Sequence, residues 1–285
     1  MDIWQRIITY GHMIRFSHSV FALPFAFSGV ALASLEHPVT PRAVLWICVA
    51  MVGARSAAMG FNRIVDRRID SLNPRTRERE LPTRKISLRA ATLFVAASAA
   101  LFIFAASQLN ELTFILAPGA LAYVLLYSYT KRFTWATHFF LGGALGMAPV
   151  GGWIAITGHF SPSALVLGLA VATWVAGFDI IYSCQDYHFD VAHGVHSICR
   201  SFGMRRALEV SKALHGCTVG LLLSLYFVSQ LGPVYLAGLA IVGALLAYEQ
   251  SMVKPHDLSK VNKAFFDLNG LVSIVYFLYT LKAVL

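Results

Sequence analysis

The stretch Asn62-Arg63-Ile64-Val65-Asp66-Arg67-Arg68-Ile69-Asp70 ends a long apolar run and places an oxygen-bearing side chain at every fourth position. Residues four apart share one face of an α-helix. Asn62, Asp66 and Asp70 are therefore expected to form one polar ridge where a membrane helix meets water. Carboxylates repeated on one face repel one another unless a cation lies among them. The pattern favours a cation site at this helix end.

A second acidic stretch, from Asp179 to Asp190, follows more than a hundred residues later. Its carboxylates are spaced seven and then four residues apart, which again predicts one helical face. Hard divalent cations prefer oxygen ligands and bridge to phosphate oxygens. Two acidic ridges that face each other predict a Mg²⁺-diphosphate site whose metal ligands are Asn62, Asp66, Asp70, Asp186 and Asp190.

Composition places the chain in the bilayer, because 57% of its 285 residues are hydrophobic and only 13% are charged. The net charge of +9 does not indicate nucleic acid, since the basic residues lie between apolar segments, as topology determinants do. The four cysteines form no Cys-x-x-Cys pair, so we expect reduced thiols without a zinc or redox motif. We find no removable signal peptide pattern and no second domain, and we expect one transmembrane domain over residues 1–285.

A spanning helix needs about 20 mostly apolar residues. The sequence predicts an all-α integral membrane protein, a bundle of nine transmembrane helices with two cytoplasmic cap loops over a central cavity. The expected spans are 16–35, 43–65, 90–108, 112–130, 135–157, 162–184, 207–230, 232–250 and 264–284.

The distribution of Lys and Arg predicts the orientation. With a cytoplasmic N-terminus, all but three of the 23 basic residues lie on or near the cytoplasmic side; the exceptions are Arg42 and Lys282 outside and Arg55 within the second span. The second, fourth and sixth spans then end at that side, so both acidic ridges and Lys131-Arg132 share one level. We expect an integral membrane protein, of the bacterial inner membrane, with its active site facing the cytoplasm.

Basic residues near the ridges are candidates for binding the diphosphate. Lys131 supplies a point charge and Arg132 a forked donor after the fourth span. Arg75, Arg79 and Lys85, in the loop after the first ridge, are expected to close over the same group as a lid.

Two charges lie deeper. Arg55 precedes Asn62 by seven residues and Asp179 precedes Asp186 by seven, so each continues the face of its ridge about 10 Å further into the helix. They form either a structural pair or an acceptor site, in which Arg55 orients an anionic acceptor and Asp179 positions a phenol or the metal shell. We expect helix-contact or packing roles for four other polar residues: His138, Glu249, Asp267 and Asn269.

At these residues the chain resembles the UbiA superfamily of intramembrane aromatic prenyltransferases, whose hallmarks are Asn-x₃-Asp-x₃-Asp after the second helix and Asp-x₃-Asp after the sixth. The resemblance covers essentially the whole chain and is greatest to the 4-hydroxybenzoate polyprenyltransferase-like branch. Two loop positions depart from it, since Arg84 stands where Gly is expected and Cys199 where Pro is expected. Shorter matching pieces are Arg15 to Pro24, Asn73 to Thr76, Arg79 to Pro82, Tyr127 to Arg132, Pro149 to Trp153, and His196 to Ile198.

The resemblance implies a Mg²⁺-dependent reaction in which diphosphate leaves an allylic polyprenyl donor and the cation attacks an aromatic ring ortho to its hydroxyl. Asp66, Asp186, Asp190 and Asp179 are the expected catalytic residues. Aromatic faces stabilise cations, and the chain holds 20 Phe, 11 Tyr and 5 Trp. The expected prenyl or cation contacts are Phe61, Tyr123, Tyr127, Phe178 and Tyr182.

The expected partners are polyprenyl diphosphate, a small aromatic acid and the lipid bilayer, with no nucleic acid and no obligatory protein partner. A 4-hydroxybenzoate acceptor for ubiquinone synthesis is favoured, and a dihydroxynaphthoate for menaquinone synthesis is the alternative. A secondary transporter would place its charges near the bilayer midplane rather than at one face. A CDP-alcohol phosphotransferase needs an Asp-x₂-Asp-Gly-x₂-Ala-Arg motif that this sequence lacks, and a structural bundle leaves both ridges unexplained.

Overall fold

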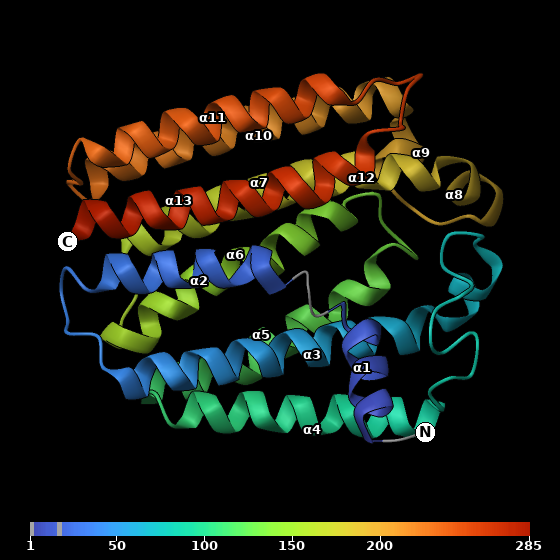
Figure 1. Ribbon diagram of the computed structural model, residues 1–285, viewed down its shortest axis with the longest axis horizontal. Coiled ribbons are helices and arrows are strands. Elements are labelled where there is room, and N and C mark those ends of the chain that lie inside the picture. Colours follow the sequence, from blue (N-terminus) through green and yellow to red (C-terminus); the bar gives the residue numbers. More distant parts are fainter. Residues whose placement is uncertain (1–2, 16–18) are drawn as a thin grey trace. The chain divides into compact units, whose positions relative to one another are not determined.

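The computed structural model describes residues 3–15 and 19–285, and these form helices without a strand ladder (Figure 1). A single isolated bridge joins Lys254 and Asp257. The helices are α1 (Ile3–Met13), α2 (Ser19–Ala33), α3 (Pro41–Leu72), α4 (Leu88–Ser107), α5 (Glu111–Thr130), α6 (Thr137–Thr157), α7 (Pro162–Ser183), η2 (Cys184–Asp186), α8 (Tyr187–His193), α9 (Ile198–Phe202), α10 (Met204–Val228), α11 (Val234–Met252), α12 (Val261–Lys263), η3 (Ala264–Leu268) and α13 (Asn269–Val284).

Eight helical stretches in the described part of the chain are long and apolar enough to cross a membrane. They correspond to the second through ninth expected spans. The first expected span, 16–35, corresponds to α2, which has 15 residues and is shorter than a full crossing needs. Its residues 16–18 lie outside the described ranges, so a count of nine stays a prediction, as do the cap loops and the central cavity.

The chain divides into two compact units, and each is described by itself. The first unit contains Met1–Ser19 and Val44–Tyr129, and the second contains Val20–Ala43 and Thr130–Leu285. A single domain over residues 1–285 therefore stays a prediction. The acidic stretch of Asn62 to Asp70 belongs to the first unit, whereas that of Asp179 to Asp190 belongs to the second.

Close packing of small residues holds the first unit together. A Cβ added at Gly53 would approach backbone atoms of Ser98 and Phe102 at 2.9–3.1 Å, so α3 and α4 are in backbone contact there. At the other end of α4, α1 covers the connecting segment: Met13 and Ile14 are buried in one cluster with Leu81, Ile86 and Ala91.

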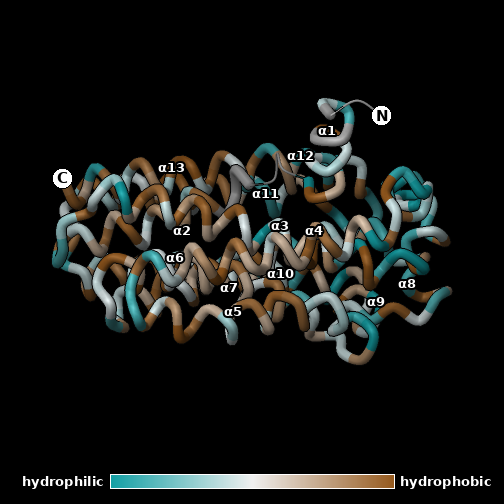
Figure 2. The backbone as a smooth tube through the Cα atoms, turned by 90° about the horizontal axis from the view of Figure 1, so that it is seen from below, coloured by the Kyte–Doolittle hydropathy of each residue, from teal (hydrophilic) through white to brown (hydrophobic). Residues whose placement is uncertain are grey.

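The second unit is organised around α7, which continues through η2 and α8 to His193 and whose apolar part is mostly buried. Helices α6 and α10 both pack on α7, and α11 packs on α10 and α13 (Figure 1). Gly146 and Gly168 allow α6 and α7 to approach backbone to backbone. Figure 2 shows mainly brown and white residues along α6 and α7 and more teal ones around α8, where the polar end of the unit begins.

Two boundaries differ from expectation in a way that matters for the site. The second expected span ends at 65, but α3 continues without interruption to Leu72 and carries the first acidic stretch within it. At about 1.5 Å per residue its 32 residues extend about 48 Å, beyond the about 30 Å of a hydrocarbon core. The segment between the sixth and seventh expected spans, residues 185–206, contains the short helices α8 and α9.

Candidate active site

The first acidic stretch forms the predicted ridge. Because α3 is unbroken from Pro41 to Leu72, the four-residue spacing places Asn62, Asp66 and Asp70 on one face. Asp66 is 1% exposed and Asp70 is 4% exposed, while Asn62 is half-buried. Burying a carboxylate costs free energy unless it is paired or coordinates a cation. This face of α3 therefore favours a positively charged group next to it.

Arg79 supplies such a partner to Asp70. Its Nη1 donates to both carboxylate oxygens of Asp70, at 2.8 and 2.9 Å. The Thr76 hydroxyl donates to the backbone carbonyl of Asp70 at 3.1 Å, so the segment after α3 folds back along the end of the helix. Arg79, predicted to contact diphosphate, thus also contacts a predicted metal ligand, and its diphosphate role stays a prediction.

The segment between α3 and α4 is anchored at several points rather than extended. Asn73 and Thr76 are buried, and the amide of Arg75 donates to Asn73 Oδ1 at 2.9 Å. Arg84 has a φ of +57°. This left-handed conformation favours glycine, which explains why glycine is the residue expected at that position. The side chains of Arg75 and Lys85, both predicted to bind diphosphate, are exposed.

Two arginines of α3 reach the residues at the end of α1. Arg55 Nη2 donates to the Arg15 carbonyl at 3.2 Å, and Arg63 Nε donates to the Met13 carbonyl at 3.1 Å. Arg63 is buried, with 5% of its surface exposed. Sequence reasoning missed Arg63 as a site residue, although a guanidinium next to Asn62 in a largely apolar helix was a signal. The acceptor role predicted for Arg55 remains a prediction.

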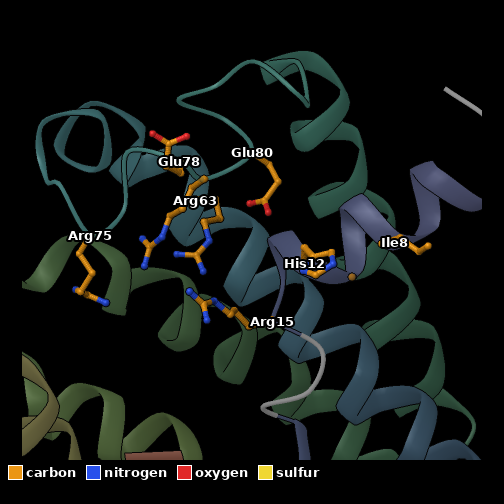
Figure 3. Close-up of a pocket in the computed structure, with 9 residues that line it drawn as sticks. Ile8, His12, Arg15, Arg63, Arg75, Glu78 and Glu80 are labelled. Atoms are coloured by element: carbon orange, nitrogen blue, oxygen red, sulfur yellow. The ribbon is translucent and has the colours of Figure 1, made fainter. Parts of the chain in front are cut away.

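A cavity of about 560 Å³ opens where α1, α3 and the segment after α3 come together. Figure 3 shows Arg63 and Arg15 pointing into this space from α3 and from the end of α1. The cavity lies wholly within the first unit. Its other lining residues are Ile8, Gly11, His12, Arg75, Glu78, Arg79 and Glu80.

Three predicted prenyl contacts belong to this unit as well. Phe61 packs edge-on against Tyr129, with ring centroids 5.9 Å apart. Tyr123 and Tyr127 lie on α5 and are half-buried. Their partial exposure is compatible with contact to an apolar chain, and their role stays a prediction.

The second acidic stretch differs from expectation. Asp179 lies near the end of α7, Asp186 in the 3₁₀ turn η2, and Asp190 in α8. A 3₁₀ turn has about 3.0 residues per turn instead of about 3.6. The 3₁₀ turn therefore shifts the phase between Asp179 and the other two carboxylates, and a single helical face shared by all three stays a prediction.

Asp179 has a partner that the sequence did not reveal. His138, on α6, donates from Nδ1 to Asp179 Oδ2 at 2.6 Å, and His138 Nε2 accepts from the amide of Ile198 at 3.4 Å. The Ile198 amide can only donate, so it fixes Nε2 as the acceptor and leaves the proton on Nδ1. The helix-contact role predicted for His138 is confirmed, and its partner is one of the expected catalytic residues.

Asp190 is held by the loop that follows it. The carboxylate is 6% exposed and accepts from the Ser197 hydroxyl at 3.1 Å. The same hydroxyl oxygen caps α9 by accepting from the Arg200 amide at 3.2 Å. One residue earlier, the His196 amide donates to the Lys131 carbonyl at 2.8 Å. The loop thus contacts both the Lys131 backbone and the Asp190 carboxylate, while the Arg132 side chain is exposed.

An aromatic cluster lines α7 one turn before this loop. Phe178 is 4% exposed, and Tyr182 lies over Phe265 with ring centroids 4.1 Å apart. Phe178 contacts Phe265 edge-on at 5.2 Å. Phe265 lies in the π-helical turn η3, a type of turn frequent at functional sites. Phe265 was not predicted, and a single Phe in an apolar run carries no distinctive signal.

A buried polar network supports that turn. Asn269 Nδ2 donates to Glu249 Oε1 at 2.8 Å and to the carbonyls of Ala264 and Phe265 at 3.1 and 3.2 Å. Glu249 is completely buried, and the His215 imidazole lies 3.9 Å from its other oxygen. The contact roles predicted for Glu249 and Asn269 are confirmed, since they join α11 to α13. His215 was not singled out from the sequence.

The oxygen-bearing side chains of each unit can be compared with the ligands that Mg²⁺ prefers. Within either unit, no three His, Cys, Asp or Glu side chains among the described residues gather closely enough to hold a metal by themselves. Mg²⁺ is typically held by one or two carboxylates, with substrate phosphates and water completing the shell. The two buried carboxylates of α3 with Asn62, and Asp186 with Asp190, are donor sets of that kind. The residues present fit the ion.

Comparison with known proteins gives the family. Residues 22–279 match the model of the UbiA prenyltransferase family. The chain is 29% identical to the 4-hydroxybenzoate octaprenyltransferase of Azoarcus sp. (strain BH72), over 97% of this chain and 96% of that protein. Its fold matches the apo structure of a UbiA homolog from Aeropyrum pernix K1 with a TM-score of 0.84 and 35% identity, covering 92% of this chain and 96% of the other.

A second structure extends the match in fold. A UbiA homolog from Archaeoglobus fulgidus bound to GPP and Mg²⁺ has a TM-score of 0.75 and 21% identity, over 97% of this chain and 99% of the other. These matches cover nearly the full length of the chain, which sets the transporter, phosphotransferase and structural alternatives aside. The chain is an integral membrane prenyltransferase and belongs to the UbiA prenyltransferase family.

Proposed function

We propose that this protein transfers a polyprenyl group from a polyprenyl diphosphate to an aromatic hydroxy acid, with 4-hydroxybenzoate as the favoured acceptor. The observation that carries the proposal is the pair of acidic stretches, each with a buried carboxylate at the polar end of a long apolar helix. Relatives named 4-hydroxybenzoate octaprenyltransferase support the choice of acceptor.

The chemistry is a substitution at an allylic carbon. The carbon–oxygen bond of the donor breaks and its electron pair leaves with diphosphate; a ring carbon ortho to the hydroxyl then forms the new bond, and the ring loses a proton. Asn62, Asp66, Asp70, Asp186 and Asp190 would hold Mg²⁺, which, when bound, neutralises charge on the departing diphosphate.

The basic residues supply the remaining positive charge. Lys131, Arg132, Arg75 and Lys85 would donate to diphosphate oxygens, because ammonium and guanidinium groups donate only and match phosphate geometry. Arg79 would donate to the diphosphate as well, and its Nη1 also holds both oxygens of Asp70. We infer that Arg79 positions Asp70.

The allylic cation must be shielded from water and stabilised by the faces of aromatic side chains. Phe178 and Tyr182, ordered by Phe265, present such faces in the second unit, and Phe61, Tyr123 and Tyr127 would do so in the first. Asp179, held by the Nδ1 proton of His138, would position the phenol of the acceptor. Arg55 would orient its carboxylate.

The direct test is an assay of purified protein with Mg²⁺ and a labelled polyprenyl diphosphate, offered 4-hydroxybenzoate and a dihydroxynaphthoate in parallel. We expect a prenylated hydroxybenzoate and loss of product on chelation of Mg²⁺. Product from the naphthoate alone would assign the chain to menaquinone synthesis instead. No product with either acceptor would overturn the proposal.

The acceptor role of Arg55 has its own test. Hydrogen bonds to charged groups contribute about 1.5–3 kcal/mol, so Arg55→Ala should weaken apparent acceptor affinity at least about tenfold and leave donor affinity closer to normal. Arg42→Ala, an exposed arginine at the start of the same helix, is the control. Equal loss of both affinities would reject the assignment.

We infer that the protein lies in a bacterial cytoplasmic membrane with its N-terminus and both acidic stretches at the cytoplasmic face. The concentration of Lys and Arg at the helix ends near those stretches supports this orientation. Reporter fusions at the C-terminus and within the segment 73–87 test it: the segment should report the cytoplasm, and the C-terminus the opposite side.

A further inference from the structure

Two of the four cysteines lie in contact within the second unit. Cys184 begins η2 and Cys199 lies in the first turn of α9, and their Sγ atoms are 2.6 Å apart. Both are free thiols, and they are 1% and 0% exposed. They are 15 positions apart in the sequence, so the Cys-x-x-Cys spacing of a redox motif is missing and tertiary packing alone makes them neighbours.

The residues around the two thiols hold them together. The Ile180 carbonyl accepts from Cys184 Sγ at 3.4 Å and from Cys199 Sγ at 3.8 Å, and the Ser183 hydroxyl donates to Cys199 Sγ at 3.6 Å. Both cysteines belong to one buried apolar cluster with Ile180 and Ile198. A disulfide forms without moving the backbone only where the fold already brings the two sulfur atoms together, and here it does.

The pair stands at the two ends of the segment that carries the second acidic stretch. Helices α8 and α9, which follow η2, lie at the polar end of α7 (Figure 1). The segment between the two cysteines contains Asp186, Asp190 and Ser197, and the Ser197 hydroxyl donates to Asp190 at 3.1 Å. A bond between Cys184 and Cys199 would close a covalent loop around both carboxylates and restrict the conformations of that loop.

Position 199 is also where this chain departs from the family resemblance, since Pro is expected there. A proline is tolerated in the first turn of a helix, where the amide has no intrahelical acceptor. The cap of α9 does not involve Cys199, because the Ser197 side chain accepts from the Arg200 amide. The backbone of α9 therefore does not require a cysteine, and what Cys199 adds is a thiol beside Cys184.

We propose that Cys184 and Cys199 are a site of reversible oxidation, and that their disulfide restrains the segment 185–198 and slows prenyl transfer. The oxidant is hydrogen peroxide, which is small and uncharged and so can reach buried thiols. One thiol takes an oxygen atom from the peroxide and becomes a sulfenic acid, and water leaves. The second thiol attacks that sulfur, so that the S–S bond forms, the S–O bond breaks and a second water leaves. Two electrons pass from the sulfur atoms to the peroxide, and a dithiol reductant reverses the reaction by exchange.

The restraint acts on transfer through the two carboxylates. Asp190 is 6% exposed and its carboxylate is bonded to Ser197. To contact a ligand, this carboxylate must exchange or share that hydrogen bond, and a segment fixed at both ends adjusts less readily. The effect on transfer rests on the proposed function, in which Asp186 and Asp190 serve the reaction. The formation of the disulfide does not depend on it.

The experiment compares the full chain in detergent after reduction with dithiothreitol and after treatment with hydrogen peroxide. Alkylation of the remaining thiols followed by mass spectrometry identifies the bond, and thermal unfolding without Mg²⁺ or substrate reports the restraint. We expect a peptide pair linked through Cys184 and Cys199, a higher Tm for the oxidised protein, and reversal of both by dithiothreitol. Cys217→Ser, at an exposed cysteine of α10, is the control and should keep the linkage and the shift.

Two variants isolate the pair. Cys199→Pro, which α9 tolerates, should transfer prenyl groups like the reduced wild type and lose the linkage and every response to peroxide. Cys184→Ala should behave in the same way and keeps the test informative if Cys199→Pro does not fold. Peroxide should lower the initial rate of the wild type at least about threefold, as expected where a segment must move during turnover, and dithiothreitol should restore it.

The outcomes separate the oxidation site from its effect and from the proposed function. Without a linkage between Cys184 and Cys199, or with equal peroxide responses in the wild type and Cys199→Pro, the proposal is overturned. A linkage that raises Tm but leaves the rate of an active enzyme unchanged overturns the effect on transfer. A protein that forms the linkage but transfers no prenyl group supports the oxidation site and overturns the proposed function.

Discussion

The two acidic stretches have the same kind of residues and different local structures. Asn62, Asp66 and Asp70 lie on one unbroken helix, so a four-residue spacing in sequence became one face in the structure. The stretch from Asp179 to Asp190 is divided among α7, a 3₁₀ turn and α8. Residues four apart share a face only within one regular α-helix. The two stretches therefore differ in the residues that contact their carboxylates.

The partners show the difference. The first stretch is charge-compensated by an arginine from the following segment, with Arg79 on Asp70. In the second stretch, Asp179 accepts a hydrogen bond from His138 and Asp190 accepts one from Ser197. We expect the first stretch to respond mainly to changes in charge and the second mainly to changes in the geometry of its loop.

The largest effects should come from the carboxylates themselves. Asp66→Ala and Asp186→Ala should each lower the rate of prenyl transfer at least about 100-fold, since removing one group that stabilises developing charge costs about 2.7–4 kcal/mol. Initial rates with saturating Mg²⁺ measure this, with Asp257→Ala, an exposed carboxylate outside the spans, as the control. Near-normal activity in Asp186→Ala alone would mean that the 3₁₀ break directs this side chain away from the reaction.

The next largest effect should be on stability, from the hydrogen bond between Glu249 and Asn269 that supports η3. Glu249→Ala removes the side-chain acceptor of Asn269 and should lower the free energy of unfolding by about 1–2 kcal/mol, because the buried amide loses one of its three acceptors and the site loses packing. Thermal unfolding in detergent measures this, and Glu249→Gln, which keeps an acceptor oxygen, should lose less. Equal loss in the two variants would show that the carboxylate charge, rather than the hydrogen bond to Asn269, supports η3.

The difference between the two stretches also explains which features could be predicted from the sequence. The first ridge was predictable because its residues are local to one long helix, and the family resemblance extended to both motifs. The partners His138 and Ser197 were not predictable as such, because they come from other segments and depend on tertiary packing. Arg63 was visible in the sequence but was not recognised, since its environment is formed by α1, which only the structure places beside it.

A smaller effect is expected at Arg79, where the first stretch is charge-compensated. Arg79→Gln removes a cation that competes for Asp70, so the apparent affinity for Mg²⁺ should rise while the maximal rate falls, each by no more than about tenfold. The Mg²⁺ dependence of the initial rate measures both quantities. A fall in Mg²⁺ affinity would show instead that Arg79 holds Asp70 in the orientation that the ion needs.

The smallest effect should come from Ser197, and it isolates what the loop of the second stretch adds. Ser197 and Ser87 both cap a helix, with their side chains accepting from the Arg200 and Ala90 amides at 3.2 Å, but only Ser197 also donates to a carboxylate, that of Asp190. Loss of a serine cap costs about 1 kcal/mol, so Ser87→Ala and Ser197→Ala should lower Tm by similar amounts.

Prenyl transfer should separate these two serine variants. Ser87→Ala removes a cap alone and should leave the rate unchanged, whereas Ser197→Ala also frees the Asp190 carboxylate and should reduce the rate about threefold to tenfold, in keeping with about 1 kcal/mol for a hydrogen bond. Equal rates in the two variants would mean that Asp190 needs no help from the loop. The second stretch would then depend, like the first, on charge alone.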